Sequence, residues 1–437
     1  MSSPGSFRYA GHDIEGSTLS CSYVMGDRSF TEQFEIGEGD WSTAGAAEAA
    51  RLVYLLTGVS YYKTAAPRSI EVDVALRTVE LDLLRDYYVK GLGEFAFTNG
   101  IALRRLSIDA DVEERPPARY EPSDPVPLVP FGGGIDSIVT VETLKRRHLD
   151  PQLFVVAPHT APYGAIEGVL PLTGLPVVRT TRHLDPQLFE PRAESGFLQG
   201  HVPITGIITA LAVLAAVGRG FGTVVLSNEW SASSGNLVVG NQVVNHQYSK
   251  SREFEVSFAR VVRGALGNAP RVFSLLRPYT EVWVAQRFAR LTEYHRSFHS
   301  CNRAFTIDPA ARLERWCGEC DKCCFIDLVL SPFLSRVELE SIFGGREPLG
   351  REDLYERFAV LVGLSADPKP FECVGEVGEC RAAASLAAER GDRRGDEVLQ
   401  RIAAQLPSVS AAEVERLMTP HTPHDIPDDF ATEDLLV

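Results

Sequence analysis

The stretch VPLVPFGGGIDSIVTVETL, residues 126–144, decides the fold. In it an apolar run breaks into three glycines, and a helix-like pattern opens directly after them. A glycine loop between a strand and a helix exposes backbone N–H groups, and the helix dipole favours an anion there. The stretch therefore predicts a phosphate-binding turn, although a plain tight turn is the alternative. The residues expected to hold the phosphate are Gly132, Gly133, Gly134, Asp136 and Ser137.

Short β-rich runs alternate with helical patterns on the C-terminal side of this loop. The runs are PLVPF (127–131), QLFVVAP (152–158), PVVRTT (176–181), TVVLSNE (223–229) and RVFSLLRP (271–278). Such alternation predicts an α/β fold with a parallel sheet that is covered on both faces. Ligands of these folds bind outside the carboxyl ends of the strands. We therefore expect the site at residues 131–137, 157–159, 227–229 and 277–279.

Three segments are predicted along the chain. Residues 1–120 form an N-terminal α+β domain, because strand-like and amphipathic helical patterns precede a linker rich in proline and charge. Residues 121–300 form the parallel-sheet α/β domain. Residues 301–437 form a cysteine-rich segment, a helical region and an acidic tail, which we expect to be solvated.

The bulk composition bounds the class of protein. The chain has 437 residues and a formal net charge of −15, which argues against nucleic acid as a partner. The long uncharged run VPITGIITALAVLAAVG, residues 202–218, is shorter than the roughly 20 residues of a membrane span, so it predicts a buried helix. No signal peptide is recognisable at the N-terminus. We therefore expect a cytoplasmic protein that has no membrane partner.

Four cysteines form a candidate metal centre. Cys317, Cys320 and Cys323 have C-x-x-C-x-x-C spacing, and Cys301 lies upstream. Four thiolates suit a closed tetrahedral zinc site, which would be structural because no coordination position stays open. Iron–sulfur ligation is the alternative metal chemistry, and Cys324 is an alternative to Cys323 as a ligand.

Several polar stretches have the residue types that an ATP-dependent enzyme needs besides its phosphate loop. They supply carboxylates for Mg²⁺, cations for phosphates and groups for proton transfer. For any single residue in them, a loop ion pair or a helix cap is the alternative. The candidates for substrate binding are Tyr62, Lys63, Glu94, Asn228, Tyr248, Arg252 and Arg277.

The glycine loop most resembles the S-G-G-x-D-S loop of the ATP pyrophosphatases, with Gly132 in place of the first serine. Those enzymes split ATP between the α and β phosphates. The upstream cysteine followed by CGECDKC resembles the 7-cyano-7-deazaguanine synthases, which share the loop. The resemblance implies an ATP-pyrophosphatase-like core with a zinc-binding segment behind it.

A more specific resemblance covers roughly residues 7–385. GVSYYK, YVKGLGEFAFTN, FGGGIDS, LSNEWSASSGN, VNHQYSKSREFE, LLRPYTE, CNRAF, WCGECDKCCF and FECVG follow one another in the order found in the MurL family. Its members are ATP-dependent UDP-N-acetyl-α-D-muramoyl-L-alanyl-L-glutamate epimerases. The resemblance implies inversion of the terminal L-Glu of UDP-MurNAc-L-Ala-L-Glu for peptidoglycan synthesis, with ATP and Mg²⁺.

The implied chemistry needs a base within reach of the glutamyl Cα. Adenylation of the neighbouring carboxylate acidifies the Cα proton, and the base then removes it. Position and titration range select, in this order, Glu229, His246, Lys250 and Cys373. An adenylating ligase or transferase acting on another carboxylate is the main alternative function, and a zinc-stabilised binding module is a third. The sequence leaves the oligomeric state open.

Overall fold

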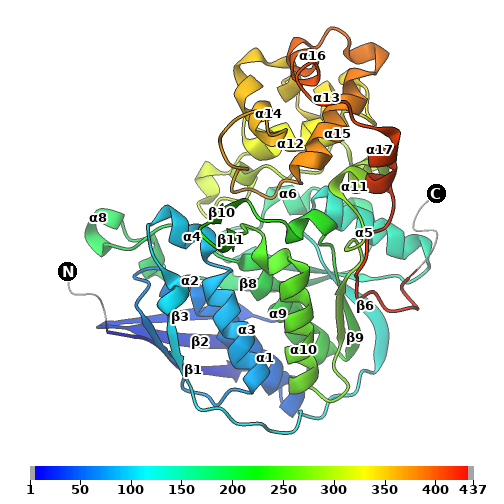
Figure 1. Ribbon diagram of the computed structural model, residues 1–437. Helices are drawn as coiled ribbons and strands as arrows, with labels where there is room; N and C mark the ends of the chain where they lie inside the picture. Colours follow the sequence, from blue (N-terminus) through cyan, green and yellow to red (C-terminus); the bar gives the residue numbers. More distant parts are fainter. Residues whose placement is uncertain (1–4, 432–437) are drawn as a thin grey trace.

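The computed structural model describes residues 5–431, and in that range ten strands form one sheet in the order β12-β9-β6-β7-β8-β3-β2-β1-β4-β5 (Figure 1). Neighbours in its first half are all parallel. This half contains β6 (Asp124–Pro130), β7 (Gln152–Pro158), β8 (Val177–His183), β9 (Phe221–Leu226) and β12 (Arg271–Ser274). The predicted α/β class and its five strands are confirmed. The strand order reverses between β6 and β9, which is the point where such sheets bind ligands.

Helices cover both faces of the parallel half. Successive strand residues point to opposite faces, so Leu128 belongs to one core and Val129 to the other, as do Val224 and Val225. Helices α1 (Ala44–Thr57), α3 (Thr78–Val89), α9 (Ile204–Arg219) and α10 (Arg252–Ala265) cover the first face. Helices α5 (Ile135–Arg146) and α11 (Glu281–Phe288) cover the second. No helix within residues 5–431, α9 included, has the length and apolar character needed to cross a membrane.

The N-terminal segment extends the same sheet. Its strands are β1 (Phe7–Glu15), β2 (Thr18–Met25), β3 (Arg28–Glu35), β4 (Ser69–Glu71) and β5 (Ser107–Asp109). β3 pairs antiparallel with β8, where Phe34 faces Arg182. Residues 7–109 therefore share a sheet and a core with the parallel half.

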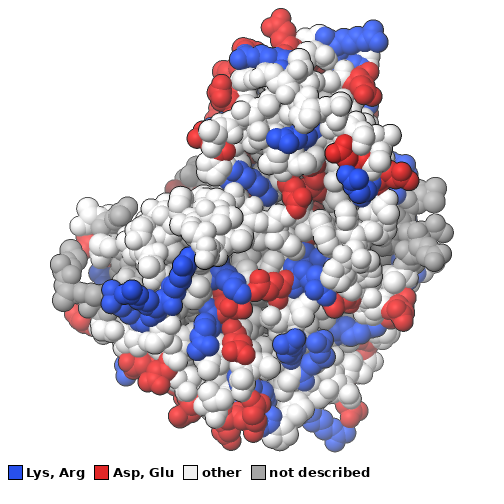
Figure 2. All heavy atoms as spheres, in the orientation of Figure 1, with Lys and Arg blue, Asp and Glu red and all other residues white. Residues whose placement is uncertain are grey.

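The C-terminal helices form a second lobe above the sheet (Figure 1). They are α12 (Asp321–Leu330), α13 (Arg336–Ile342), α14 (Tyr355–Leu361), α15 (Val377–Ala388), α16 (Glu397–Ala403) and α17 (Ala411–Met418). The shorter elements are α2 (Val59–Tyr62), α4 (Gly93–Thr98), α6 (Gly164–Glu167), α7 (Leu170–Thr173), α8 (Arg192–Ser195), β10 (Leu237–Val239) and β11 (Gln242–Val244). Acidic and basic side chains are interspersed over the face shown in Figure 2.

The expectation of a solvated tail is wrong for Ile426 and Phe430. Ile426 and Phe430 are buried, and the ring of Phe430 packs edge-on against Phe273 of β12. Asp429 forms an ion pair with Arg271 at 2.7 Å. The apolar side chains between the acidic residues pack this segment against the sheet domain. Residues 432–437 of the predicted tail lie outside the described range.

Candidate active site

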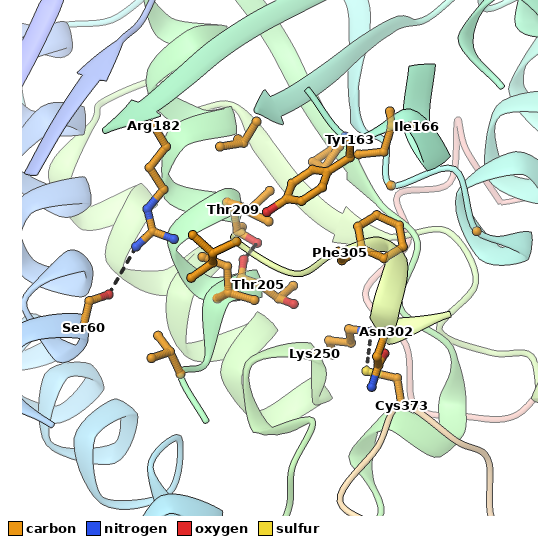
Figure 3. Close-up of a pocket in the computed structure, with 18 of the residues that line it drawn as sticks. Ser60, Tyr163, Ile166, Arg182, Thr205, Thr209, Lys250, Asn302, Phe305 and Cys373 are labelled. Carbon is orange, nitrogen blue, oxygen red and sulfur yellow. Dashed lines mark hydrogen bonds between the residues drawn. The ribbon is translucent and has the colours of Figure 1, made fainter. Parts of the chain in front are cut away.

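A cavity of about 740 Å³ opens at the carboxyl ends of β6 and β9, next to the point where the strand order reverses. Its walls come from distant parts of the chain. Arg182 and Ser60 lie on one side, and Lys250 and Cys373 lie on the other (Figure 3). Of the four predicted strand-end segments, residues 131–137 and 227–229 contribute to the lining of the cavity, whereas none of residues 157–159 or 277–279 lines it.

The glycine loop forms one end of the cavity. Gly133 has φ +72°, and a Cβ there would lie 3.1 Å from the carbonyl oxygen of Ala165, so only glycine fits without strain. Gly134 is the N-cap residue of α5, and Ser137 Oγ donates to its carbonyl oxygen at 3.0 Å. Gly132, Gly134, Asp136 and Ser137 line the cavity, whereas Gly133 does not. The loop thus presents backbone groups at the start of a helix, as a phosphate site requires.

Three carboxylates, two buried and one half-buried, meet beside this loop. Asp136, Glu229 and Glu281 come from α5, the end of β9 and the start of α11, and one oxygen of each lies within 4.8 Å of the others. Within residues 5–431, each retains a buried oxygen that has no hydrogen-bond partner. Burial and the charge of Glu229 raise the pKa of Asp136 to about 7, although lysines oppose the shift. Burial, together with Asp136 and Glu229, also raises the pKa of Glu281 well above its usual value.

Arg277 and Asn228, both predicted to bind substrate, have different positions. Arg277 is fully buried and does not line the cavity. It donates to the carbonyl oxygens of Glu229 at 2.7 Å and of Lys250 at 2.6 Å, so it holds two site segments in place. Asn228 lines the cavity and donates to Ser274 Oγ at 3.1 Å.

A thiol surrounded by cations lies in the cavity wall. Lys250 Nζ is 3.2 Å from Cys373 Sγ. Burial alone would raise the pKa of Cys373, but Lys250, His246 and Lys322 lower it to about 5. The thiolate is therefore its dominant form at neutral pH.

The imidazole of His246 lies next to this thiol and the carboxylate of Glu94 lies next to the imidazole, and neither group lines the cavity. His246 Nδ1 hydrogen-bonds Glu94 Oε2. Burial would lower the pKa of His246, but Cys373 and Glu94 raise it to about 9. The ring of His201 lies 4.2 Å from that of His246, and burial and the cations around it lower the pKa of His201 to about 3. The order of charges is thus carboxylate, imidazolium and thiolate.

The remaining predicted substrate residues do not converge on the cavity, with one exception. Lys63 lines it, and burial and Arg182 lower the pKa of Lys63 to about 8. Tyr62 is buried among aromatic rings and donates to Pro67 O at 2.9 Å. Tyr248 is buried against Phe254, and Arg252 pairs with Asp425 at 2.8 Å. These three side chains therefore pack against or pair with other parts of the protein and do not face the cavity.

Lys322 and Glu379 are two of the site residues that sequence reasoning missed. Lys322 lines the cavity. In the sequence, the metal-binding spacing of the neighbouring cysteines already explains this stretch, so nothing singles out the lysine. Glu379 of α15 accepts a hydrogen bond from Glu281 N at 2.8 Å, and burial raises the pKa of Glu379 to about 7. Only the tertiary structure could reveal Glu379, because its stretch resembles an ordinary helix start.

The four predicted metal-binding cysteines converge at the base of the second lobe. The Sγ–Sγ distances are 3.9 Å for Cys301–Cys320 and 3.5 Å for both Cys317–Cys323 and Cys320–Cys323. Zn–S bonds of about 2.3 Å in a tetrahedron separate sulfurs by about 3.8 Å. Cys324 is buried and does not belong to the group.

Two family models match the chain, the MurL N-terminal domain over residues 3–275 and the MurL C-terminal domain over residues 297–417. The chain belongs to the MurL family. In this MurL chain, the glycine loop lies in the first matched region, whereas Lys322 and Cys373 lie in the second, so the cavity needs both.

Three relatives carry one name, UDP-N-acetyl-alpha-D-muramoyl-L-alanyl-L-glutamate epimerase. The protein from Micromonospora sp. is 38% identical over 93% of this chain and 91% of its own. Those from Salinispora tropica and Xanthomonas oryzae pv. oryzae are each 37% identical, over 93% and 89% of this chain and 89% and 86% of their own. No solved structure matches the chain significantly. Because epimerases are isomerases, the expectation that this MurL chain is an isomerase is confirmed.

Proposed function

We propose that the chain inverts the terminal L-Glu of UDP-MurNAc-L-Ala-L-Glu to D-Glu, with consumption of ATP, and so supplies D-Glu for peptidoglycan. The observation that carries this proposal is the similarity, over nearly the whole chain, to relatives named for that epimerisation. The cavity supports it, because a phosphate-type loop and a thiolate face the same space.

The first step is activation of the α-carboxylate of the terminal glutamate. One carboxylate oxygen attacks the α-phosphorus of ATP, and the bond to the β-phosphate oxygen breaks with release of pyrophosphate. The product is an acyl adenylate, whose carbonyl withdraws electrons from Cα more strongly than a carboxylate does. The loop from Gly132 to Ser137 is the proposed site for the leaving phosphates.

Asp136, Glu229 and Glu281 are the proposed ligands of Mg²⁺. Their unpartnered buried oxygens fit a hard divalent cation, because oxygen ligands are its preference and the cation would relieve their mutual repulsion. Mg²⁺ held by these carboxylates would neutralise negative charge on the phosphates of ATP. Glu379 orients the start of α11, and with it Glu281, through the backbone N–H group of Glu281.

Cys373 is the proposed base for the Cα proton. The sequence placed Glu229 first, but Glu229 lies among the carboxylates, whereas the Cys373 thiolate faces the cavity with Lys250 beside it. The thiolate takes the proton and the electron pair moves onto the acyl carbonyl as an enolate, which the Lys250 ammonium group stabilises. Return of a proton to the opposite face gives the D centre, and water then releases AMP.

Cys301, Cys317, Cys320 and Cys323 are the proposed ligands of structural zinc. Their sulfur spacing supports a single tetrahedral ion, because a cluster of several irons would keep the thiolates farther apart.

The test is to incubate the protein with ATP, Mg²⁺ and UDP-MurNAc-L-Ala-L-Glu in D₂O. We expect AMP, deuterium at the glutamyl Cα, and D-Glu after acid hydrolysis of the product. AMP without deuterium at Cα would point to the ligase or transferase alternative. The absence of both AMP and inversion would contradict the proposal.

A further inference from the structure

Lys322 has an ammonium group that the proposed chemistry leaves without a role. The side chain is 7% exposed and lines the cavity. Its Nζ donates to the carbonyl oxygen of Cys373 and lies 5.0 Å from the ring centroid of Phe325. Within the described residues, no carboxylate lies within 4.0 Å of this Nζ. Lys322 shares this part of the cavity with the acidic groups of Asp136, Glu281 and Cys373, whose pKa values it lowers. An ammonium group has three N–H donors, and one of them reaches the Cys373 carbonyl oxygen, so Lys322 can also bind an anionic ligand in the cavity.

The surroundings of Lys322 indicate which end of the cavity this ligand occupies. The charge of Lys322 acts on Asp136, which follows the glycine loop. Lys322 also lines the same cavity as Gly132 and Gly134. A polyanion on the glycine loop would therefore bring its charge toward the Lys322 ammonium group.

The cysteine centre fixes the backbone on both sides of Lys322. Lys322 lies between Cys320 and Cys323 in the first turn of α12, so two proposed zinc ligands bracket it. The other arm of the centre has the same arrangement, because Ser300 and Asn302 flank Cys301 and both line the cavity. A Cβ on Gly134 would lie 3.1 Å from Ser300 Oγ, so this arm contacts the glycine loop.

We propose that Lys322 binds the phosphate chain of ATP, and that zinc on the four cysteines positions it. Zinc occupancy and nucleotide binding are then coupled, and the coupling is reciprocal: ATP must retain zinc as strongly as zinc promotes ATP binding. The inference rests on the proposed use of ATP and extends it. In this proposal zinc has no role in the reaction itself. It contributes to nucleotide binding because it fixes the backbone on both sides of Lys322.

The first experiment measures the dissociation constant of ATP with Mg²⁺ by calorimetry, without the UDP-dipeptide. Lys322→Met removes the charge and keeps the length, and Lys322→Arg keeps the charge. Lys145→Met, in the last turn of α5 and outside the cavity, is the control. We expect Lys322→Met to weaken ATP binding about tenfold or more, Lys322→Arg to weaken it less, and the control to match the wild type. Zinc content should stay near one ion per chain in all three.

The second experiment tests the coupling in folded protein. Zinc release to a chromogenic chelator is timed with and without saturating ATP and Mg²⁺. We expect ATP to slow release severalfold in the wild type and in Lys145→Met, and to slow it much less in Lys322→Met. For each variant, the rate of zinc release with ATP is compared with the rate without ATP, so the folded protein serves as its own reference.

The outcomes separate the inference from the proposed function. Wild-type protein that binds no ATP would overturn the ATP-dependent function. ATP binding that is equal in the wild type and in Lys322→Met would overturn the role of Lys322 while leaving that function intact. Zinc release at one rate with and without ATP, or a chain without zinc, would overturn the coupling.

Discussion

Cys373 differs from the buried cysteines of the chain because cations face it. Its pKa of about 5 lies below the ordinary thiol value, so the thiolate fraction rises with pH through about 5 and is nearly complete at 7. We therefore predict alkylation of Cys373 by iodoacetamide with a half-maximal rate near pH 5, measured on its peptide by mass spectrometry. His246→Ala should move this midpoint upward, because an imidazolium is lost. A wild-type midpoint between 8 and 9 would contradict the ion pair.

The same residue gives a prediction that separates proton transfer from adenylation. Cys373→Ser should lower Cα hydrogen exchange by about 10²- to 10⁴-fold, the usual contribution of a positioned base, yet leave AMP formation measurable. Asp136→Ala should stop both, because Asp136 is needed before the adenylate forms. Cys380→Ala is the matched control, since Cys380 is buried in α15 away from the cavity. Wild-type exchange in Cys373→Ser would transfer the role of base to another residue.

At the scale of the element, the glycine loop contains two residues with opposite tolerance. Gly133→Ala should destabilise the protein by about 1–2 kcal/mol, because its φ is +72° and the Ala165 carbonyl oxygen is close. Gly132→Ser, which restores the hydroxyl of the pyrophosphatase loop, should leave stability within about 0.5 kcal/mol, since no atom lies within 4 Å of its Cβ position. Urea unfolding of both variants measures the difference. Equal destabilisation of the two variants would contradict the conformational difference between these two positions.

Elements also show what the sequence could and could not predict. The parallel strands and the loop after β6 were predictable, because alternation and turn composition are local properties. The directions of Tyr62 and Arg277 were not, because a polar side chain near a strand end can point into the core as well as into a cleft. The meeting of Asp136 with Glu281 depends on the packing of α5 against α11, which no local pattern encodes.

At the scale of the whole molecule, the cysteine centre lies at the base of the second lobe, next to residues that line the cavity. We predict about one zinc per purified chain, measured by elemental analysis. Cys320→Ser should lower both zinc content and Tm, because metal-binding energy is folding energy in such sites. Cys324→Ala, next to the centre but outside it, should keep the zinc. A metal-free preparation with unchanged Tm would contradict a structural ion.

The division of the cavity between the two ends of the chain has a consequence for protein synthesis. The glycine loop leaves the ribosome early, whereas Lys322 and Cys373 follow only when most of the 437 residues have been made. A fragment from interrupted translation would contain the glycine loop but neither Cys373 nor Lys322. If ATP binds in the cavity as proposed, such a fragment lacks part of the site, so aborted translation would not leave behind a partial enzyme that consumes ATP.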